Sequence, residues 1–447
     1  MTSAGGNRPV YLAAAIVSIG GLLFGYDLLV ASGAILFIKQ DMALSPGREE
    51  WVLSAALLGA ALGAGLAGTA SDRFGRRSVL FVTALAFVIG AVGTALAPSS
   101  AWLITGRTVT GIGIGMASVT VPLYISEISP VEIRGQLVSI NTLAGATGAV
   151  LAFVVGFAFS DHGAWRWMFG LGVVPGVALA LGLLRISETP RWLVSHDRHD
   201  QGRRVLERLR GRDDVEQELE SIAGATSRAS WSELLGPAVR PALLVGTGLA
   251  VLQRVTGVNV GLVYGPTVLE AAGFGSASVD MLASIAIGVM LLVATLIGMR
   301  LVDRKGRRPL LVFGFAAMCV ALVTLGLTFS FMPSGARWLA LGSILLLVGA
   351  WMIGPGMVVF LLLSEIYPTR VRGLAMSVSI VALWGSFLVV SMTLLSLIDW
   401  LGRPLTFWLF GGLCVVALIF VLRFAPETRG RSLEDIEASW HRGAASG

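Results

Sequence analysis

Long apolar runs, separated by short polar segments, make up most of the chain. They are continuously apolar rather than alternating, which excludes the strands of a membrane barrel. Each holds the roughly 20 residues that a helix needs to cross a bilayer, and a helix satisfies its own backbone hydrogen bonds in lipid. The runs fall at 10–38, 51–71, 79–97, 101–125, 136–160, 167–186, 240–272, 279–301, 309–331, 338–364, 373–398 and 404–424. The pattern predicts an all-α membrane protein with twelve transmembrane helices, six in each half.

The polar segments suggest four regions. We expect an N-terminal six-helix bundle over 1–186, a cytoplasmic linker over 187–239, a C-terminal six-helix bundle over 240–424 and a cytoplasmic tail over 425–447. The linker contains QGRRVLERLRGRDDVEQELESIAG, whose charged and amphipathic pattern favours short surface helices. The first apolar run is too long for the core of a signal peptide and is expected to be a retained helix.

Composition and charge support a lipid environment. Of the 447 residues, 55% are hydrophobic and only 13% are charged, whereas a soluble domain carries roughly 25% charged residues. Most Lys and Arg residues fall in segments that are inside the cell if the N-terminus is inside, and this bias sets orientation. The few outer ones are Lys39, Arg48, Arg166, Arg337 and Arg403. We therefore expect both termini in the cytoplasm, no nucleic-acid partner, and, from the short loops, a multi-pass protein of a bacterial inner membrane.

Polar motifs recur in the two halves at nearly constant spacing. GTASDRFGRRSVL follows the second run and MRLVDRKGRRPLL the eighth, while PLYISEISPVEIRG follows the fourth and FLLLSEIYPTRVRG the tenth. SETPRWL follows the sixth run and APETRG the twelfth. The acids matched by these repeats are Asp72 with Asp303, Glu127 with Glu365, and Glu188 with Glu427. Parallel repeats of this kind place a substrate site between the halves near the midplane, which favours a transporter.

Nine motifs spread along the chain are together highly specific. They are FGYD at 24–27, GTASDRFGRR at 68–77, GRTVTGIGIG at 106–115, PLYISEISPVEIRG at 122–135, SETPRWL at 187–193, QRVTGVN at 253–259, DRKGRR at 303–308, SEIYPTRVRG at 364–373 and PETRG at 426–430. With these motifs the chain resembles the sugar porters of the major facilitator superfamily. The resemblance implies two pseudo-symmetric six-helix bundles, alternating access, and a proton-coupled symporter.

Asp27 is an acid in the middle of the first apolar run, where an ionisable group is costly unless it has a partner or a polar cavity. Arg107 lies at a similar depth in the fourth run, so the two can pair. In the resembled family an acid at this position marks proton-coupled symporters. We expect Asp27 and Arg107 to couple the proton, and the alternative is a permanent structural bridge. The four histidines all lie outside the spans, which excludes a histidine relay.

The resemblance also implies a site in which amides and aromatic rings bind sugar hydroxyls, as such groups require. The expected substrate-binding positions are Phe24, Thr142, Gln253, Arg254, Asn259, Tyr264, Phe360 and Trp384. This chain departs from the family at Arg254, Thr142 and Phe360, and also at Leu383 and Val263. Two interpretations of Arg254 stay open: it recognises an anionic group such as the carboxylate of a sugar acid, or it pairs with an internal acid such as Asp27.

Opposite charges recur at the inner helix ends of both halves. The expected cytoplasmic gate residues are Asp72, Arg73, Arg76, Glu127, Arg134, Glu188, Arg191, Asp303, Arg304, Arg307, Glu365, Arg372 and Glu427. One hypothesis is a latch that closes the inner side when the transporter faces outward and comes apart when it opens inward. The alternative is that these charges only fix topology and solvate loops.

The leading prediction is a secondary active transporter that couples a proton to a sugar, a polyol or a related small hydroxylated metabolite. The alternative is a proton-coupled antiporter that exports a less polar or anionic molecule. A nutrient sensor would be expected to carry a long cytoplasmic tail, and the tail here is short. No metal-ligand cluster, nucleophile–base set or phosphate loop is recognised, so we expect neither an enzyme nor a metal or other cofactor. The expected partners are the substrate, protons and lipid, with the monomer as the functional unit.

Overall fold

The computed structural model describes residues 8–130, 133–160, 163–211, 214–224, 231–237, 239–273, 277–331, 336–368 and 371–429. All regular elements in these ranges are helices. They are α1 (Arg8–Asp41), α2 (Pro46–Phe74), α3 (Arg76–Ala95), α4 (Ser100–Ile128), α5 (Arg134–Ala158), α6 (Trp165–Gly170), α7 (Val173–Leu183), α8 (Pro190–Ser195), α9 (His199–Arg210), α10 (Glu216–Gly224), α11 (Trp231–Leu234), α12 (Arg240–Val255), α13 (Asn259–Leu262), α14 (Gly265–Ala271), α15 (Ala277–Lys305), α16 (Arg307–Phe331), α17 (Ala336–Trp351), η1 (Met352–Gly356), α18 (Met357–Ile366), α19 (Arg372–Leu401) and α20 (Arg403–Phe424).

The predicted spans correspond closely to the observed helices. Eleven segments within the described ranges are long and apolar enough to cross a membrane. The remaining predicted span, 240–272, is divided into α12, α13 and α14. The first break contains Gly257, two residues after α12 ends. Its φ of 84° is not helical and is readily adopted by glycine. Discontinuous helices of this kind line the binding sites of many transporters.

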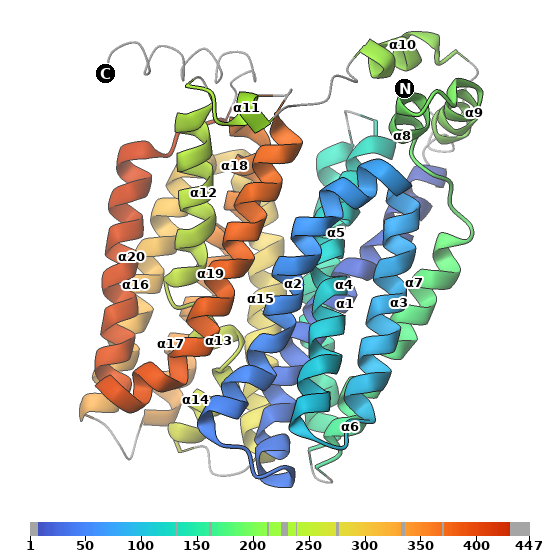
Figure 1. Ribbon diagram of the computed structural model, residues 1–447. Helices are drawn as coiled ribbons and strands as arrows, with labels where there is room; N and C mark the ends of the chain where they lie inside the picture. The colour runs from blue at the N-terminus through green and yellow to red at the C-terminus, as the bar shows by residue number, and fades with distance from the viewer. Residues whose placement is uncertain are drawn as a thin grey trace.

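Figure 1 shows two groups of long helices, α1–α7 and α12–α20. The short helices α8, α9, α10 and α11 all lie at one end of the molecule, and we call this end the linker side. The opposite end, where α6 and α14 lie, is the far side. The two groups meet mainly through α2 with α19 and through α5 with α15. These two helix pairs therefore form most of the interface between the groups.

Candidate functional site

Two helices of the first half bring an acid and a base together within the spans. Arg107 of α4 donates from Nη1 to the Asp27 carboxylate of α1 at 2.6 Å and to the Asp27 backbone oxygen at 3.1 Å. Arg107 is fully buried and Asp27 is 7% exposed. The guanidinium carbon also lies 5.5 Å from the centre of the Phe169 ring. The pair satisfies the requirement that a charged group within a span has a partner.

Close packing of α1 on α5 fixes the position of Asp27. A side chain on Gly25 would collide with the backbone oxygen of Gly145, so the two helices approach to backbone contact at this point. Tyr26 donates its hydroxyl hydrogen to the Met168 backbone oxygen at 2.5 Å, which ties α1 to α6 as well. Because Gly25 and Tyr26 are both fixed by these contacts, the Asp27 carboxylate that follows them is held against α4.

The candidate substrate residues of the seventh span lie on both sides of its break. Gln253 and Arg254 lie in the last turn of α12, Asn259 begins α13, and Tyr264 precedes α14. Asn259 donates to Ser391 Oγ at 3.0 Å, and the Tyr264 hydroxyl donates to the Ser391 backbone oxygen at 2.5 Å. Both side-chain amide atoms of Gln253 and the Oδ1 atom of Asn259 are buried without a hydrogen-bond partner. Buried polar atoms are costly when unpaired, so these atoms mark positions suited to a polar ligand.

Arg254 lies among aromatic rings. Its guanidinium carbon is 4.3 Å from the Phe387 ring centre, 5.1 Å from that of Trp351 and 5.9 Å from that of Trp384. The residue is 3% exposed, and its Nε and Nη1 atoms have no hydrogen-bond partner. Asp27 instead pairs with Arg107. The interpretation in which Arg254 pairs with Asp27 therefore has no contact among the described residues to support it.

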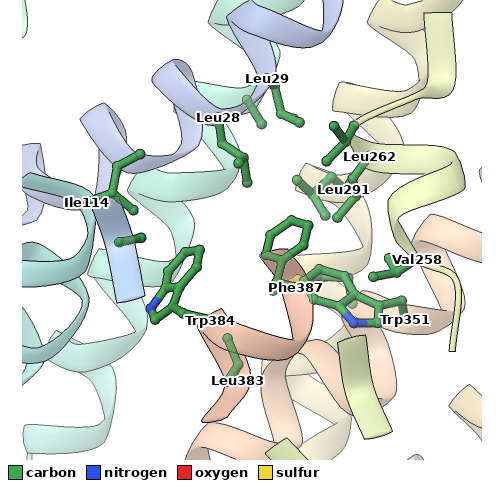
Figure 2. Close-up of a cluster of buried hydrophobic side chains, with 14 of the residues drawn as sticks. Leu28, Leu29, Ile114, Val258, Leu262, Leu291, Trp351, Leu383, Trp384 and Phe387 are labelled. Atoms are coloured by element: carbon green, nitrogen blue, oxygen red, sulfur yellow. The ribbon is translucent and has the colours of Figure 1, made fainter. Parts of the chain in front are cut away.

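Trp384 of α19 connects the two halves at this site. Its ring meets the Phe24 ring of α1 edge-on, with 5.8 Å between centres, and its Nε1 donates to Ser118 Oγ of α4 at 3.4 Å. In Figure 2, Phe387 lies between Trp384 and Trp351. The other two expected positions, Thr142 on α5 and Phe360 on α18, are half-buried. The site is therefore built from both halves, with most of its rings and amides supplied by the second.

Apolar and polar contacts between the halves close the far side. Figure 2 shows Leu28 and Leu29 of α1 facing Leu262 and Leu291 of the second half, and all four side chains are buried. Nearer the end of the molecule, Lys39 pairs with Glu270 at 2.8 Å. Glu50 of α2, which is 6% exposed, accepts from the Ser396 backbone N–H at 3.0 Å and from its hydroxyl at 3.2 Å. The far side is thus sealed by a leucine layer backed by charged groups.

At the linker side, Arg76 is the centre of a charge network in the first half. Its Nη2 lies 3.0 Å from both Asp72 and Glu127. Glu188 accepts from the backbone N–H groups of Arg76 and Arg77 at 3.0 Å, which caps the start of α3. Burial raises the pKa of Glu188, and the N–H donors offset this only in part. Thr189 donates to the second oxygen of Glu127 at 2.6 Å.

The second half repeats this network. Arg307 pairs with Glu365 at 2.6 Å, and Glu427 accepts from the backbone N–H groups of Arg307 and Arg308 at 3.0 Å. Thr428 donates to the second oxygen of Glu365. Burial raises the pKa of Glu427, but its N–H donors outweigh burial, so this pKa lies below its usual value. The sequence repeat is therefore also a repeat of contacts.

The remaining expected gate residues differ in their surroundings. Arg372 is half-buried and donates from Nε to the Tyr367 backbone oxygen at 3.3 Å. The side chain of Asp303 lies outside the described residues. Four arginines are exposed: Arg73, Arg134, Arg191 and Arg304. Because both networks described above join elements of the same half, a latch between the halves stays a prediction.

Comparison with known proteins assigns the family. The family described as "Sugar (and other) transporter" matches residues 13–440. The chain belongs to this family. The members of this family are described as transporters, not enzymes, and the sequence motifs also predicted a transporter.

Among the relatives of this sugar transporter chain, a D-xylose transporter of Levilactobacillus brevis is 38% identical over 429 residues, which cover 94% of each chain. An arabinose-proton symporter of Bacillus subtilis (strain 168) is 35% identical over 443 residues, which cover 96% of this chain and 95% of the relative. The inward open structure of the xylose transporter XylE from E. coli matches with a TM-score of 0.83 at 30% identity, over 96% of this chain and 100% of that one. The predicted all-α major facilitator fold is confirmed by this match.

Several residues of the site were not predicted from the sequence. Thr189 and Thr428 each follow the capping glutamate of their half, so the E-T pair in both motifs was a usable signal. Glu50 is an acid at the start of an apolar run, and its burial follows only from the contact with the other half. Trp351 and Phe387 carry no signal, because an aromatic residue in a span is usually a packing residue.

Proposed function

We propose that this chain is a proton-coupled symporter that carries a sugar, a polyol or a related small hydroxylated metabolite by alternating access. The buried Asp27–Arg107 pair is the observation that carries the proposal. Asp27 lies one helical turn from Phe24, whose ring contacts Trp384 in the candidate substrate site. Relatives named as a D-xylose transporter and an arabinose-proton symporter support this class of substrate and this coupling.

Asp27 is proposed to carry the proton. With the carboxylate charged, the pair is electrically neutral and joins α1 to α4 through the 2.6 Å contact. Protonation neutralises the carboxyl and leaves Arg107 as an uncompensated charge, which weakens the connection between these helices. Because Phe24 and Asp27 share one helix, the same change alters the contact of α1 with Trp384. Proton loading and substrate binding are thereby coupled through α1.

The linker side is proposed to be cytoplasmic, together with both termini, because most Lys and Arg residues lie there. With this orientation the far side, where the leucine layer and the Glu50–Ser396 contact join the halves, faces out of the cell. Transport requires the leucine layer and the Glu50–Ser396 contact to separate when the far side opens. The two networks around Arg76 and Arg307 are proposed to hold the inner ends of each half, with the latch as their further role.

Uptake into proteoliposomes tests the proposal. Wild type and Asp27→Asn are compared on a panel of hexoses, pentoses, polyols and sugar acids, with and without an inward proton gradient. Asn has nearly the shape of a protonated Asp but cannot release a proton, so we expect accumulation to be lost while exchange of substrate across the membrane continues. Gradient-driven accumulation by Asp27→Asn would contradict the role of Asp27. Failure of wild type to accumulate any panel member would overturn symport and lead to tests of export.

A further inference from the structure

Arg254 is a buried cation that no acidic side chain neutralises among the described residues. The buried acids among the described residues have other partners: Asp27 pairs with Arg107, and Glu50 accepts from Ser396. Arg254 is instead surrounded by the rings of Phe387, Trp351 and Trp384. Cation–π contacts compensate only part of the cost of removing a guanidinium from water. The protein therefore holds a positive charge that an anion would stabilise.

Other unpaired polar atoms belong to residues close to Arg254 in the chain. Nε and Nη1 of Arg254 are buried without partners, and so are both amide atoms of Gln253 on the same turn. Oδ1 of Asn259, across the helix break, is also buried and unpaired. These groups together offer a cation, amide donors and amide acceptors. They fit a molecule that carries both a negative charge and hydroxyl groups.

The charge and shape of the guanidinium select the anion. A guanidinium is a planar donor that matches the geometry of a carboxylate. It supplies one positive charge, which balances a monoanion and leaves a dianion such as a sugar phosphate with an excess negative charge in a buried site. The apolar residues Leu383 and Phe360 on the neighbouring helices offer fewer partners for hydroxyls, which also disfavours a fully hydroxylated neutral sugar.

We propose that the substrate is a hydroxylated monocarboxylate, either a cyclic sugar acid (uronate) or an open-chain one (aldonate), and that Arg254 binds its carboxylate. This inference rests on the proposed symport function and names the substrate class of the same site. The Gln253 amide donates to and accepts from the substrate hydroxyls, and Asn259 Oδ1 accepts from them, while the faces of the aromatic rings pack on the C–H groups. A proton carried with a monoanion, one for one, makes the transport cycle electrically neutral.

The first experiment measures proton-driven uptake by wild-type proteoliposomes of D-glucuronate, D-gluconate, D-glucose and D-glucose 6-phosphate. We expect accumulation of at least one of the two acids to exceed that of glucose by about 10-fold or more. A preference for glucuronate would indicate a cyclic sugar acid as the substrate, and a preference for gluconate an open-chain one. Preference for glucose with intact proton coupling, or for the phosphate, would overturn the inference and leave symport standing. If none is accumulated and the wider panel also fails, symport and the inference both fall.

The second experiment changes the cation. Arg254→Gln is expected to weaken binding of the preferred acid by about 30-fold or more, because it removes one member of a buried charge pair. Arg254→Lys keeps the charge but not the planar donor and is expected to lose less. Arg403→Gln is the matched control, because Arg403 also lies over a ring, that of Phe329 at 5.7 Å, but is exposed. Wild-type affinity in both Arg254 variants would overturn the inference.

Tryptophan fluorescence of the purified protein in detergent gives a binding readout that does not require transport, since Trp351 and Trp384 lie beside Arg254. Thermal unfolding of each variant separates a lost site from a lost fold, and Arg254→Lys serves if the glutamine variant does not fold. In vesicles, uptake of the acid by wild type is expected to be independent of a potassium–valinomycin potential. A rate that rises with interior-negative potential would contradict the one-for-one cycle with a monoanion.

Discussion

Glu50 allows a direct test of how the far side is held closed. The Glu50 residue is 6% exposed, and its carboxylate accepts from the Ser396 backbone N–H at 3.0 Å and from the Ser396 hydroxyl at 3.2 Å. These contacts join α2 of one half to α19 of the other. A hydrogen bond to a charged group contributes about 1.5 to 3 kcal/mol. Glu50→Ala should therefore shift the equilibrium between closed and open far sides by roughly 10- to 100-fold, at about 1.4 kcal/mol per factor of ten.

The Lys39–Glu270 pair at the same end provides a graded comparison. Its side chains are 26% and 44% exposed, and exposed ion pairs contribute about 0 to 1 kcal/mol. Lys39→Ala should therefore shift the same equilibrium by at most about fivefold. Glu50→Gln keeps an acceptor without the charge and should lie between the two. The expected order of opening is Glu50→Ala, then Glu50→Gln, then Lys39→Ala.

Accessibility of a cysteine placed in the leucine layer measures the opening. Leu29→Cys is made in a background without Cys319 and Cys414, and an impermeant maleimide is added on the far side. The labelling rate should rise by about 10-fold or more when Glu50→Ala is added, and by much less with Lys39→Ala. Equal rates with and without Glu50→Ala would refute the assignment of Glu50 to the seal. A larger effect of Lys39→Ala would show that burial is the wrong guide to the strength of these contacts.

Two further predictions concern stability and use thermal unfolding in detergent. The pKa of Glu427 lies below its usual 4.5, so its stabilisation is present above about that pH and is lost as pH falls through the lowered pKa; Glu427→Gln should cost more stability at pH 7 than at pH 3. The pKa of Glu188 is raised instead, so the stability that this group contributes falls as pH rises from 4.5 through the raised pKa. Glu188→Gln should therefore cost more stability at pH 3 than at pH 7. An identical pH trend for the two variants would contradict both assignments. Gly257→Ala should lower the melting temperature more than Gly273→Ala. Both glycines have positive φ (84° and 91°), but only at Gly257 would the new Cβ meet a neighbour, Phe410 Cβ at 2.7 Å. Equal losses would show that backbone strain alone determines the effect.

Much of the fold followed from the sequence because hydropathy reports directly on the contact with lipid. Eleven of the twelve predicted spans begin and end within about five residues of the observed ones, and the twelfth, 240–272, covers α12, α13 and α14. The break after Val255 was not predicted, since Gly257 is one of 56 glycines and most of these serve close packing. In a membrane helix a glycine gives the same sequence signal whether it bends the chain or allows a neighbour to approach.

A contact within the site could be predicted only where the depth of two residues in the membrane was enough to match them. Asp27 and Arg107 could be matched because both positions could be counted from a helix end. The surroundings of Arg254 could not be predicted in this way, because its neighbours Trp351 and Phe387 come from two other helices whose rotation depends on packing throughout the second half. The sequence repeat indicated which charges correspond, and the structure added which atoms they contact.

The break in the seventh span divides the candidate site between two supports. α12, with Gln253 and Arg254, packs on α19 and α20, whereas α14, next to Tyr264, packs on α15 and on α1 of the other half. Because the helical path is broken at Gly257, α12 and α14 are not parts of one continuous helix. A molecule bound by Arg254 on one side of the break and by Asn259 on the other would bridge the break. The bound substrate would then hold the two parts of the seventh span together. A loaded site would differ from an empty one by this connection across the break.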